Sequence, residues 1–135
     1  MSDLANYLEA AVQEWWADGQ AFPNAPDNIY VGLHTGVPGN DAGSNEVDAG
    51  DYERLETSSA DWDVLSGDGP TVVENSNELE FSDADNNWGD ISHASLWDAQ
   101  SDGNPLWQGE LNDTRTIDEG DRLVFPSGDF EASLD

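Results

Sequence analysis

The sequence contains no cysteine and no lysine, and its permanent positive charge is limited to three arginines. The absence of cysteine excludes disulfides, zinc sites built on thiolates and cysteine nucleophiles. Binding of nucleic acid through its phosphates requires a broad track of Lys and Arg. Arg54, Arg115 and Arg122 cannot supply such a track, so we expect no nucleic-acid partner.

Long apolar runs are also missing. No segment approaches the roughly 18 consecutive apolar residues of a membrane-spanning helix. The N-terminal stretch, MSDLANYLEAAVQEWW, lacks the basic region and the uninterrupted apolar run of a signal peptide. We therefore expect no membrane association and a chain that is soluble when made.

Acidic residues dominate the charge. Thirty Asp and Glu face the three arginines, giving a formal net charge of -27. Apolar and aromatic residues still recur in ordered clusters, unlike in a disordered acidic tail. Acids spread over a whole chain without lysine are typical of a surface in molar salt, where the Debye length is about 3 Å and repulsion is screened. We predict a halophilic, most simply haloarchaeal, setting, in which an acidic cluster says little about a binding site.

The length of 135 residues indicates one domain, residues 1–135. A helix is predicted within residues 1–18, with Ser2 or Asp3 as its cap and Gly19 at its end. Its apolar face is formed by Leu4, Leu8, Ala11, Val12 and Trp15. This face is expected to pack on its own domain; the alternative is docking on a neighbouring subunit.

Beyond the helix the pattern is that of short strands. Residues 29–35 form the first, and the Gly- and Asp-rich stretch 36–51 is a long loop, either a functional excursion or a contact made in an assembly. Further strands are predicted near residues 52–57, 61–65, 71–74, 78–81, 91–98, 105–111, 115–117, 121–125 and 129–134. Residues 91–111 read as a central hairpin. The whole predicts a mainly β fold, an antiparallel, jelly-roll-like β-sandwich with one N-terminal α-helix.

Two histidines are candidates for chemistry. His34 and His93 could meet across a sandwich and, with an acid, bind a metal or act as a general base. No local spacing of a metal or protease motif accompanies either residue. The simpler expectation is a strand histidine that is hydrogen-bonded in the core or at an interface.

A cation is the second candidate ligand. Asp83, Asp85 and Asn87 alternate in a way that could present oxygens to Ca²⁺ or Mg²⁺, although the EF-hand pattern fails. A second set of acids, Asp41, Asp48 and Asp51, is a weaker candidate. No cofactor is required by any motif.

Aromatic residues form the third candidate. Trp62, Trp88, Trp97 and Trp107, with Tyr30 and Tyr52, could stack sugars, or could fill the core and hairpin. Trp97 and Trp107 flank the turn of the predicted hairpin, close enough for a cross-strand or diagonal pair. We favour the core or a subunit interface for these residues.

Five segments in order resemble a known family. They are YVGLHTGVPG, EVDAGDYER, WGDISHASLWD, GNPLWQGEL and GDRLVF, the last followed by a terminal LD. This order resembles small virion proteins of tailed bacterial and archaeal viruses, often labelled tail fibre proteins. The resemblance implies a non-enzymatic particle component, a compact β-sandwich assembled in several copies, and brings no catalytic residues.

Three functions remain open at this point. The first is an oligomeric surface protein of a haloarchaeal tailed virus, on the head as a decoration, turret or spike, or on the tail as a fibre or baseplate module. The second is a carbohydrate-binding module that recognises a host receptor, and the third a hydrolase using His34 or His93. We expect contacts with copies of itself and other virion proteins, and each arginine to pair with a carboxylate, at least one across a subunit boundary.

Overall fold

The structure, a computed structural model, describes residues 3–67, 69 and 71–133. Its elements are β1 (Asp3–Leu4), α1 (Asn6–Ala17), β2 (Ile29–His34), β3 (Leu55–Thr57), a 3₁₀ turn (Ser59–Asp61), β4 (Trp62–Leu65), β5 (Val72–Asn75), β6 (Leu79–Glu80), β7 (Gly89–Trp97), β8 (Pro105–Ile117), β9 (Val124–Phe125) and β10 (Glu131–Ser133). The fold is mainly β, with antiparallel sheets and one α-helix, which confirms the predicted fold class.

The main layer is a five-stranded sheet in the order β1-β8-β7-β2-β3. Its centre is the β7–β8 hairpin, where the sequence predicted one. Two strands were expected in place of β8. The structure has one continuous strand there. Its pairing with β7 shifts register, because Ile91 pairs with Arg115 and His93 with Glu110, so that residues 111–114 of β8 lie opposite the single residue Ser92.

The second layer consists of two small sheets, β10-β5-β4 and β6-β9, rather than one continuous sheet. The core lies between the layers. It takes Val31, Leu33, Ala94, Leu96 and Trp107 from one face of the main sheet. Opposite them lie Leu79, Phe81, Leu123, Phe125 and Phe130. The rings of Trp107 and Phe130, 5.7 Å apart between centroids, join the two layers.

Side chains alternate along a strand, so the opposite face of the same sheet carries Gly32, His34, Ser95, Trp97 and Gln108. This face is polar yet buried. The loop 36–51 borders it: Glu46 pairs with His34 in an isolated bridge, and the Val47 amide donates to the Leu33 carbonyl. The long loop therefore folds back onto its own chain.

The sequence predicted the C-terminal end of the helix correctly but not its N-terminal cap. Gly19, with φ of +70°, ends it as expected, and the Gln20 amide donates to the Glu14 carbonyl. The predicted cap Asp3 is wrong, because Asp3 pairs with Gln108 in β1 and the N-cap is Ala5, without a side-chain hydrogen bond. Ser2 lies outside the described residues.

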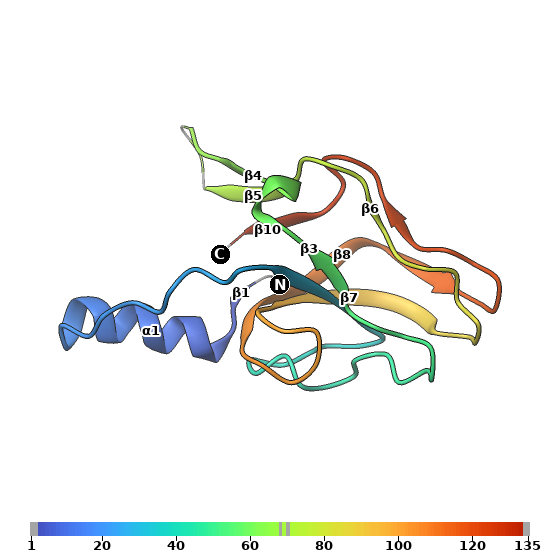
Figure 1. The fold of residues 1–135 in the computed structure, drawn as a ribbon, viewed down its shortest axis with the longest axis horizontal. Helices are drawn as coiled ribbons and strands as arrows, with labels where there is room; N and C mark the ends of the chain where they lie inside the picture. The colour runs from blue at the N-terminus through green and yellow to red at the C-terminus, as the bar shows by residue number, and fades with distance from the viewer. Residues whose placement is uncertain (1–2, 68, 70, 134–135) are drawn as a thin grey trace.

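Figure 1 shows α1 at one end of the long axis of the molecule, beyond the edge of the sheets. None of its residues is buried, although Leu8 near its base is partly covered. The expected packing on its own domain is thus limited to the base of the helix. In the described part of the chain, no helix has the length and apolar character to span a membrane.

Candidate functional site

The most elaborate polar cluster surrounds Arg54, which follows the long loop and is only 8% exposed. Its guanidinium makes a two-pronged pair with Glu46, through Nε at 2.9 Å and Nη2 at 3.0 Å. Nη1 donates to the carbonyls of Ala99 and Asp102 in the β7–β8 turn, at 3.1 and 2.9 Å. The guanidinium lies 3.7 Å from the Trp97 ring centroid. Arg54 therefore ties the long loop to the hairpin turn.

Tyr52 and His34 extend this cluster into the sheet. The Tyr52 hydroxyl donates to Glu46 at 2.9 Å and accepts from the Leu33 amide at 2.8 Å. His34 lies with Nδ1 2.8 Å from the Ser44 carbonyl and Nε2 2.7 Å from Ser95 Oγ. Because a carbonyl only accepts, Nδ1 carries the proton, and Nε2 accepts from the Ser95 hydroxyl.

Ser95 completes the chain of hydrogen bonds. Its Oγ also accepts from Trp97 Nε1 at 2.7 Å, so both functions of the hydroxyl are used. Gly32 lies across from Ser95, and a Cβ there would lie 2.6 Å from Ser95 Oγ. The network therefore requires glycine at position 32.

Electrostatics follow from this burial. Burial lowers the pKa of His34, although the Ser44 carbonyl and the Glu46 charge oppose the shift. Burial would raise the pKa of Glu46, but the hydrogen bond and charge of Arg54, with the Tyr52 hydroxyl, hold it below its usual range. Burial also raises the pKa of Tyr52. At neutral pH the cluster thus holds a neutral His34 and a charged Glu46–Arg54 pair.

Ser95 and His34 are hydrogen-bonded in the way that a serine nucleophile and its general base are, but both side chains are enclosed in the protein interior. Both residues are fully buried, and neither hydroxyl nor ring nitrogen is left to face a substrate. His34 and His93 are directly opposite each other on β2 and β7, not across a sandwich. The simpler expectation for His34, a hydrogen-bonded core histidine, is the one the structure shows. Nδ1 of the half-buried His93 lies 2.7 Å from Ser92 Oγ.

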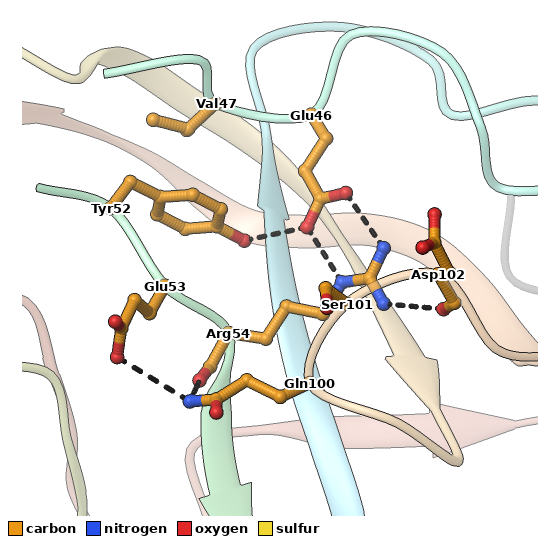
Figure 2. A pocket seen from close by; sticks show the side chains of 8 residues that line it. All are labelled: Glu46, Val47, Tyr52, Glu53, Arg54, Gln100, Ser101 and Asp102. Carbon is orange, nitrogen blue, oxygen red and sulfur yellow. Dashed lines mark hydrogen bonds and ion pairs between the residues drawn. The ribbon is translucent and has the colours of Figure 1, made fainter. Parts of the chain in front are cut away.

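An open pocket of about 330 Å³ lies over the Arg54 cluster (Figure 2). Besides Glu46, Tyr52 and Arg54 it is lined by Val47, Glu53, Gln100, Ser101 and Asp102. Figure 2 shows that Arg54 turns toward Glu46 and the Asp102 backbone, and that Gln100 spans Glu53 and the Arg54 carbonyl. Arg54, the cationic residue in the lining of this pocket, already binds groups of its own chain through all three guanidinium nitrogens.

The other two arginines also bind carboxylates of their own chain. Arg115 pairs with Asp129, donates to the Val124 carbonyl and lies 4.6 Å from the Phe125 ring centroid. The exposed Arg122 pairs with Glu80 and Asp83. The expectation that each arginine pairs with a carboxylate is confirmed; a pair across a subunit boundary stays a prediction.

The four candidate tryptophans do not share a surface. Trp88, Trp97 and Trp107 are buried, and Trp62 is half-buried against Phe130. Each indole N–H donates within the chain, to Asp51, Ser95, the Ser133 carbonyl and Thr57 respectively. Trp107 is paired with Leu96 and points into the core, whereas Trp97 points to the opposite face. The expected cross-strand or diagonal pair of Trp97 and Trp107 is therefore wrong, because the register places the two side chains on opposite faces of the hairpin.

The predicted cation ligands are largely engaged elsewhere. Asp83 binds Arg122, and Asn87 Oδ1 accepts from the Glu119 amide. Asp51 accepts from Asn86 and Trp88 side chains and from the Asp85 amide, so it organises the loop before β7. Asp41 accepts from the Gly43 amide. Within residues 3–67, 69 and 71–133, no group of three or more acidic or histidine side chains is placed to hold a metal.

Sequence reasoning missed the partners of these residues. Glu46, Ser44 and Ser95 were not singled out, and only their joint contact with His34 and Arg54 makes them a cluster. One signal was available, because the EVDAGDYER segment contains Glu46, Tyr52 and Arg54 together. A salt bridge in so acidic a chain has many possible carboxylates, so the spacing alone could not choose one.

A family model described as "Podophage GP4 fiber I protein gp80" matches residues 3–133, nearly the whole chain. No curated protein sequence matches significantly.

Proposed function

Because the chain belongs to the family of podophage GP4 fiber I protein gp80, we propose that it is a non-enzymatic structural component of the tail of a haloarchaeal virus, assembled in several copies. Family membership itself supports a phage fibre-type structural role and a place in the virion. The tail position, the host and the oligomer are the steps that this proposal adds. Partners are then other copies and other virion proteins.

One observation carries the structural role. The groups best suited to chemistry, His34, Ser95, Arg54 and Glu46, satisfy one another inside the fold and fasten the long loop to the sheet. Such a network rigidifies a small domain without exposing a reactive group. A particle component has to keep its shape against neighbours, which this arrangement favours.

A halophilic setting is supported by how few carboxylates find a cation. Ion pairs in the described part of the chain use Glu46, Glu80, Asp83 and Asp129, out of thirty acidic residues in the sequence. On the small sheet, Asp63, Glu74 and Glu131 lie side by side on three paired strands. Like charges in that position are tolerable where salt screens them.

Carbohydrate recognition is the weaker alternative. It was based on a platform of four tryptophans, of which three are buried and the fourth half-buried. A sugar-stacking face needs at least two accessible rings. The two tryptophans that are exposed, Trp15 and Trp16, are adjacent residues on the helix.

The test is a density map of purified particles of the virus that encodes this protein. We expect this fold, with its protruding helix, in several symmetric copies within the tail. Its appearance on the head, as a decoration, turret or spike, would contradict the tail position. Its absence from particles, or a single unpaired copy, would contradict the structural or the oligomeric part of the proposal.

A further inference from the structure

Strand β4 (Trp62–Leu65) is an outer strand of the small sheet β10-β5-β4. It pairs with β5 along one edge, from Trp62 opposite Asn75 to Leu65 opposite Val72. No strand lies along its other edge in the described part of the chain, so the backbone N–H and C=O groups that point outward lack a ladder partner. Figure 1 shows the β4–β5 hairpin projecting at the margin of the molecule. This edge is therefore open to a strand from outside the chain.

The side chains of β4 include apolar groups on both faces of the sheet. Val64 is 68% exposed and Leu65 46%, and consecutive residues of a strand point to opposite faces. Among the strand residues that the structure describes, these two are the large hydrophobic side chains that are exposed. Apolar residues on both faces are typical of a strand inside a sheet, whereas natural edge strands usually carry charges or proline. Asp63 is the one charge of β4, so the strand is only partly protected against pairing.

We propose that β4 binds β4 of a second copy as an antiparallel pair, which joins two three-stranded sheets into one sheet of six strands. The contact is isologous, because the same edge serves both copies around a two-fold axis. It uses the main-chain hydrogen bonds by which exposed sheet edges add a strand. The inference rests on the oligomeric assembly proposed above and names the edge that makes one of its contacts.

Self-complementarity favours a second copy as the partner. In an antiparallel pair, every second residue directs both its N–H and its C=O toward the neighbouring strand. A two-fold rotation therefore brings the outward groups of β4 opposite the same groups of the partner, with donors facing acceptors. The rotation also keeps each face of the sheet continuous, so that the exposed Val64 and Leu65 of both copies are covered in one contact.

Charge selects the register of this pair. Because side chains of one face must stay on that face, the axis passes through Val64 or through one of its neighbours. An axis at Asp63 would place two carboxylates directly opposite each other, which is destabilising. An axis at Leu65 would pair Val64 with Ser66, which lies beyond the end of β4. With the axis at Val64, the two valines lie opposite each other and Asp63 lies opposite the partner's Leu65.

This register adds no like-charge neighbour to the acidic face of the small sheet. Glu131, Glu74 and Asp63 lie in a row across the three strands. The partner's Leu65 takes the next position in the row, and the partner's Val72 follows it, because Leu65 pairs with Val72 within each chain. Repulsion between the remaining charges of the two chains is screened in molar salt, where the Debye length is about 3 Å.

The paired strands form a small interface. Two four-residue strands are expected to bury less than about 1,200 Å², which is the range of weak and transient contacts. Association in solution should therefore depend on protein concentration. In a particle, neighbouring proteins that hold the copies in place raise the effective concentration of the two edges.

Disulfide trapping detects such a contact without requiring tight binding, since the natural chain contains no cysteine. Residues directly opposite in an antiparallel pair have Cβ atoms about 4.5–5.5 Å apart, close to the span of a disulfide. In molar KCl, Val64→Cys is expected to form covalent dimers roughly tenfold faster than Val37→Cys, because pairing raises the effective concentration of the two thiols. Val37, which is 64% exposed on the long loop, is the matched control. Equal rates would overturn the proposal.

A second pair of variants tests the register. Leu65→Cys alone is expected to cross-link slowly, because each Leu65 lies opposite Asp63 of the partner and not opposite its own copy. Addition of Asp63→Cys chains should capture it rapidly in mixed dimers. Rapid cross-linking of Leu65→Cys to itself, or no gain on mixing, would overturn the axis at Val64.

Sedimentation tests the contact in chains without cysteine. In molar KCl the mean mass of the wild type should rise with protein concentration, whereas Val64→Asp, which places two carboxylates at the axis, should stay monomeric. Val37→Asp carries the same change of charge and should behave like the wild type, and circular dichroism checks that both variants are folded. A wild type that stays monomeric, or Val64→Asp that associates through another surface, would overturn the pairing of β4. Either result leaves the place of the protein in the particle, tested by the density map, untouched.

Discussion

Arg54 and Arg122 carry the same charge in opposite surroundings. Arg54 is 8% exposed and is held by Glu46, two carbonyls and the face of Trp97, whereas Arg122 is exposed and binds Glu80 and Asp83 at the surface. A lysine keeps the charge but has neither the planar fork nor the stacking surface of arginine. The two positions should therefore respond very differently to the same substitution.

We expect Arg54→Lys to lower the free energy of unfolding by about 2–3 kcal/mol, since a buried charge pair loses partners. Arg122→Lys, its matched control, should cost less than about 1 kcal/mol, as exposed ion pairs usually do. Urea denaturation of both variants in molar KCl measures the difference. Equal losses would show that Arg54 does not hold the loop and the hairpin turn together.

His34 gives the fold a dependence on pH. Its pKa is lowered by burial, so the unfolded chain binds more protons than the folded chain once the pH falls below the ordinary value of about 6.5. Stability from this group is present above that pH and is lost on acidification. The charged groups around it are Glu46, which favours protonation, and Arg54 and His93, which oppose it.

We expect the free energy of unfolding to fall between pH 7 and 5.5 by up to about 1.4 kcal/mol per pH unit from His34. His34→Gln should be less stable at pH 7 and should show a shallower fall. His93→Gln is the control, because the less deeply buried His93 contributes less. Urea titrations at several pH values in molar KCl test this, and identical slopes for His34→Gln and wild type would contradict it. The window stays above the range where most carboxylates titrate.

At the scale of elements, alternation and turn residues predicted the strands well. The central hairpin, β2 and most of the short strands lie within a few residues of their predicted bounds. Period-two patterns report local side-chain direction, which a strand fixes by itself. The two-residue β1 was missed because its pairing partner, Leu4 with Trp107, is a hundred residues away and leaves no local pattern.

For the helix and the long loop, the local sequence did not predict the tertiary contacts. A helical period indicated α1 but not what its apolar face meets, and the structure leaves that face open. The loop lacked periodicity, yet Pro38, Ala42 and Val47 are buried and Glu46 reaches Arg54. Such contacts depend on where the two ends of the loop are held, which is a property of the sheet and not of the loop sequence.

At the scale of the whole molecule, net charge is the dominant property. With a charge of -27, folding brings carboxylates closer together than in the unfolded chain, which costs free energy unless salt screens them. The same repulsion between carboxylates occurs locally among three acidic residues of the small sheet, Asp63, Glu74 and Glu131. Glu74 on β5 lies opposite Asp63 on β4 and Glu131 on β10, and no arginine pairs with any of the three in the described residues.

The three neighbouring carboxylates allow a test, at the single residue Glu74, of whether salt screening stabilises the acidic surface. Glu74→Gln removes two like-charge cross-strand pairs, so at 0.1 M KCl, where the Debye length is about 10 Å, it should stabilise the protein by several tenths to about 1 kcal/mol. In molar KCl, with a Debye length of about 3 Å, the gain should largely vanish. Glu78→Gln, in the turn before β6 and without a cross-strand partner, should change little at either salt concentration. Urea denaturation of the three proteins across a KCl series measures this. A gain from Glu74→Gln that is as large in molar KCl would mean that screening does not set the stability of this acidic surface.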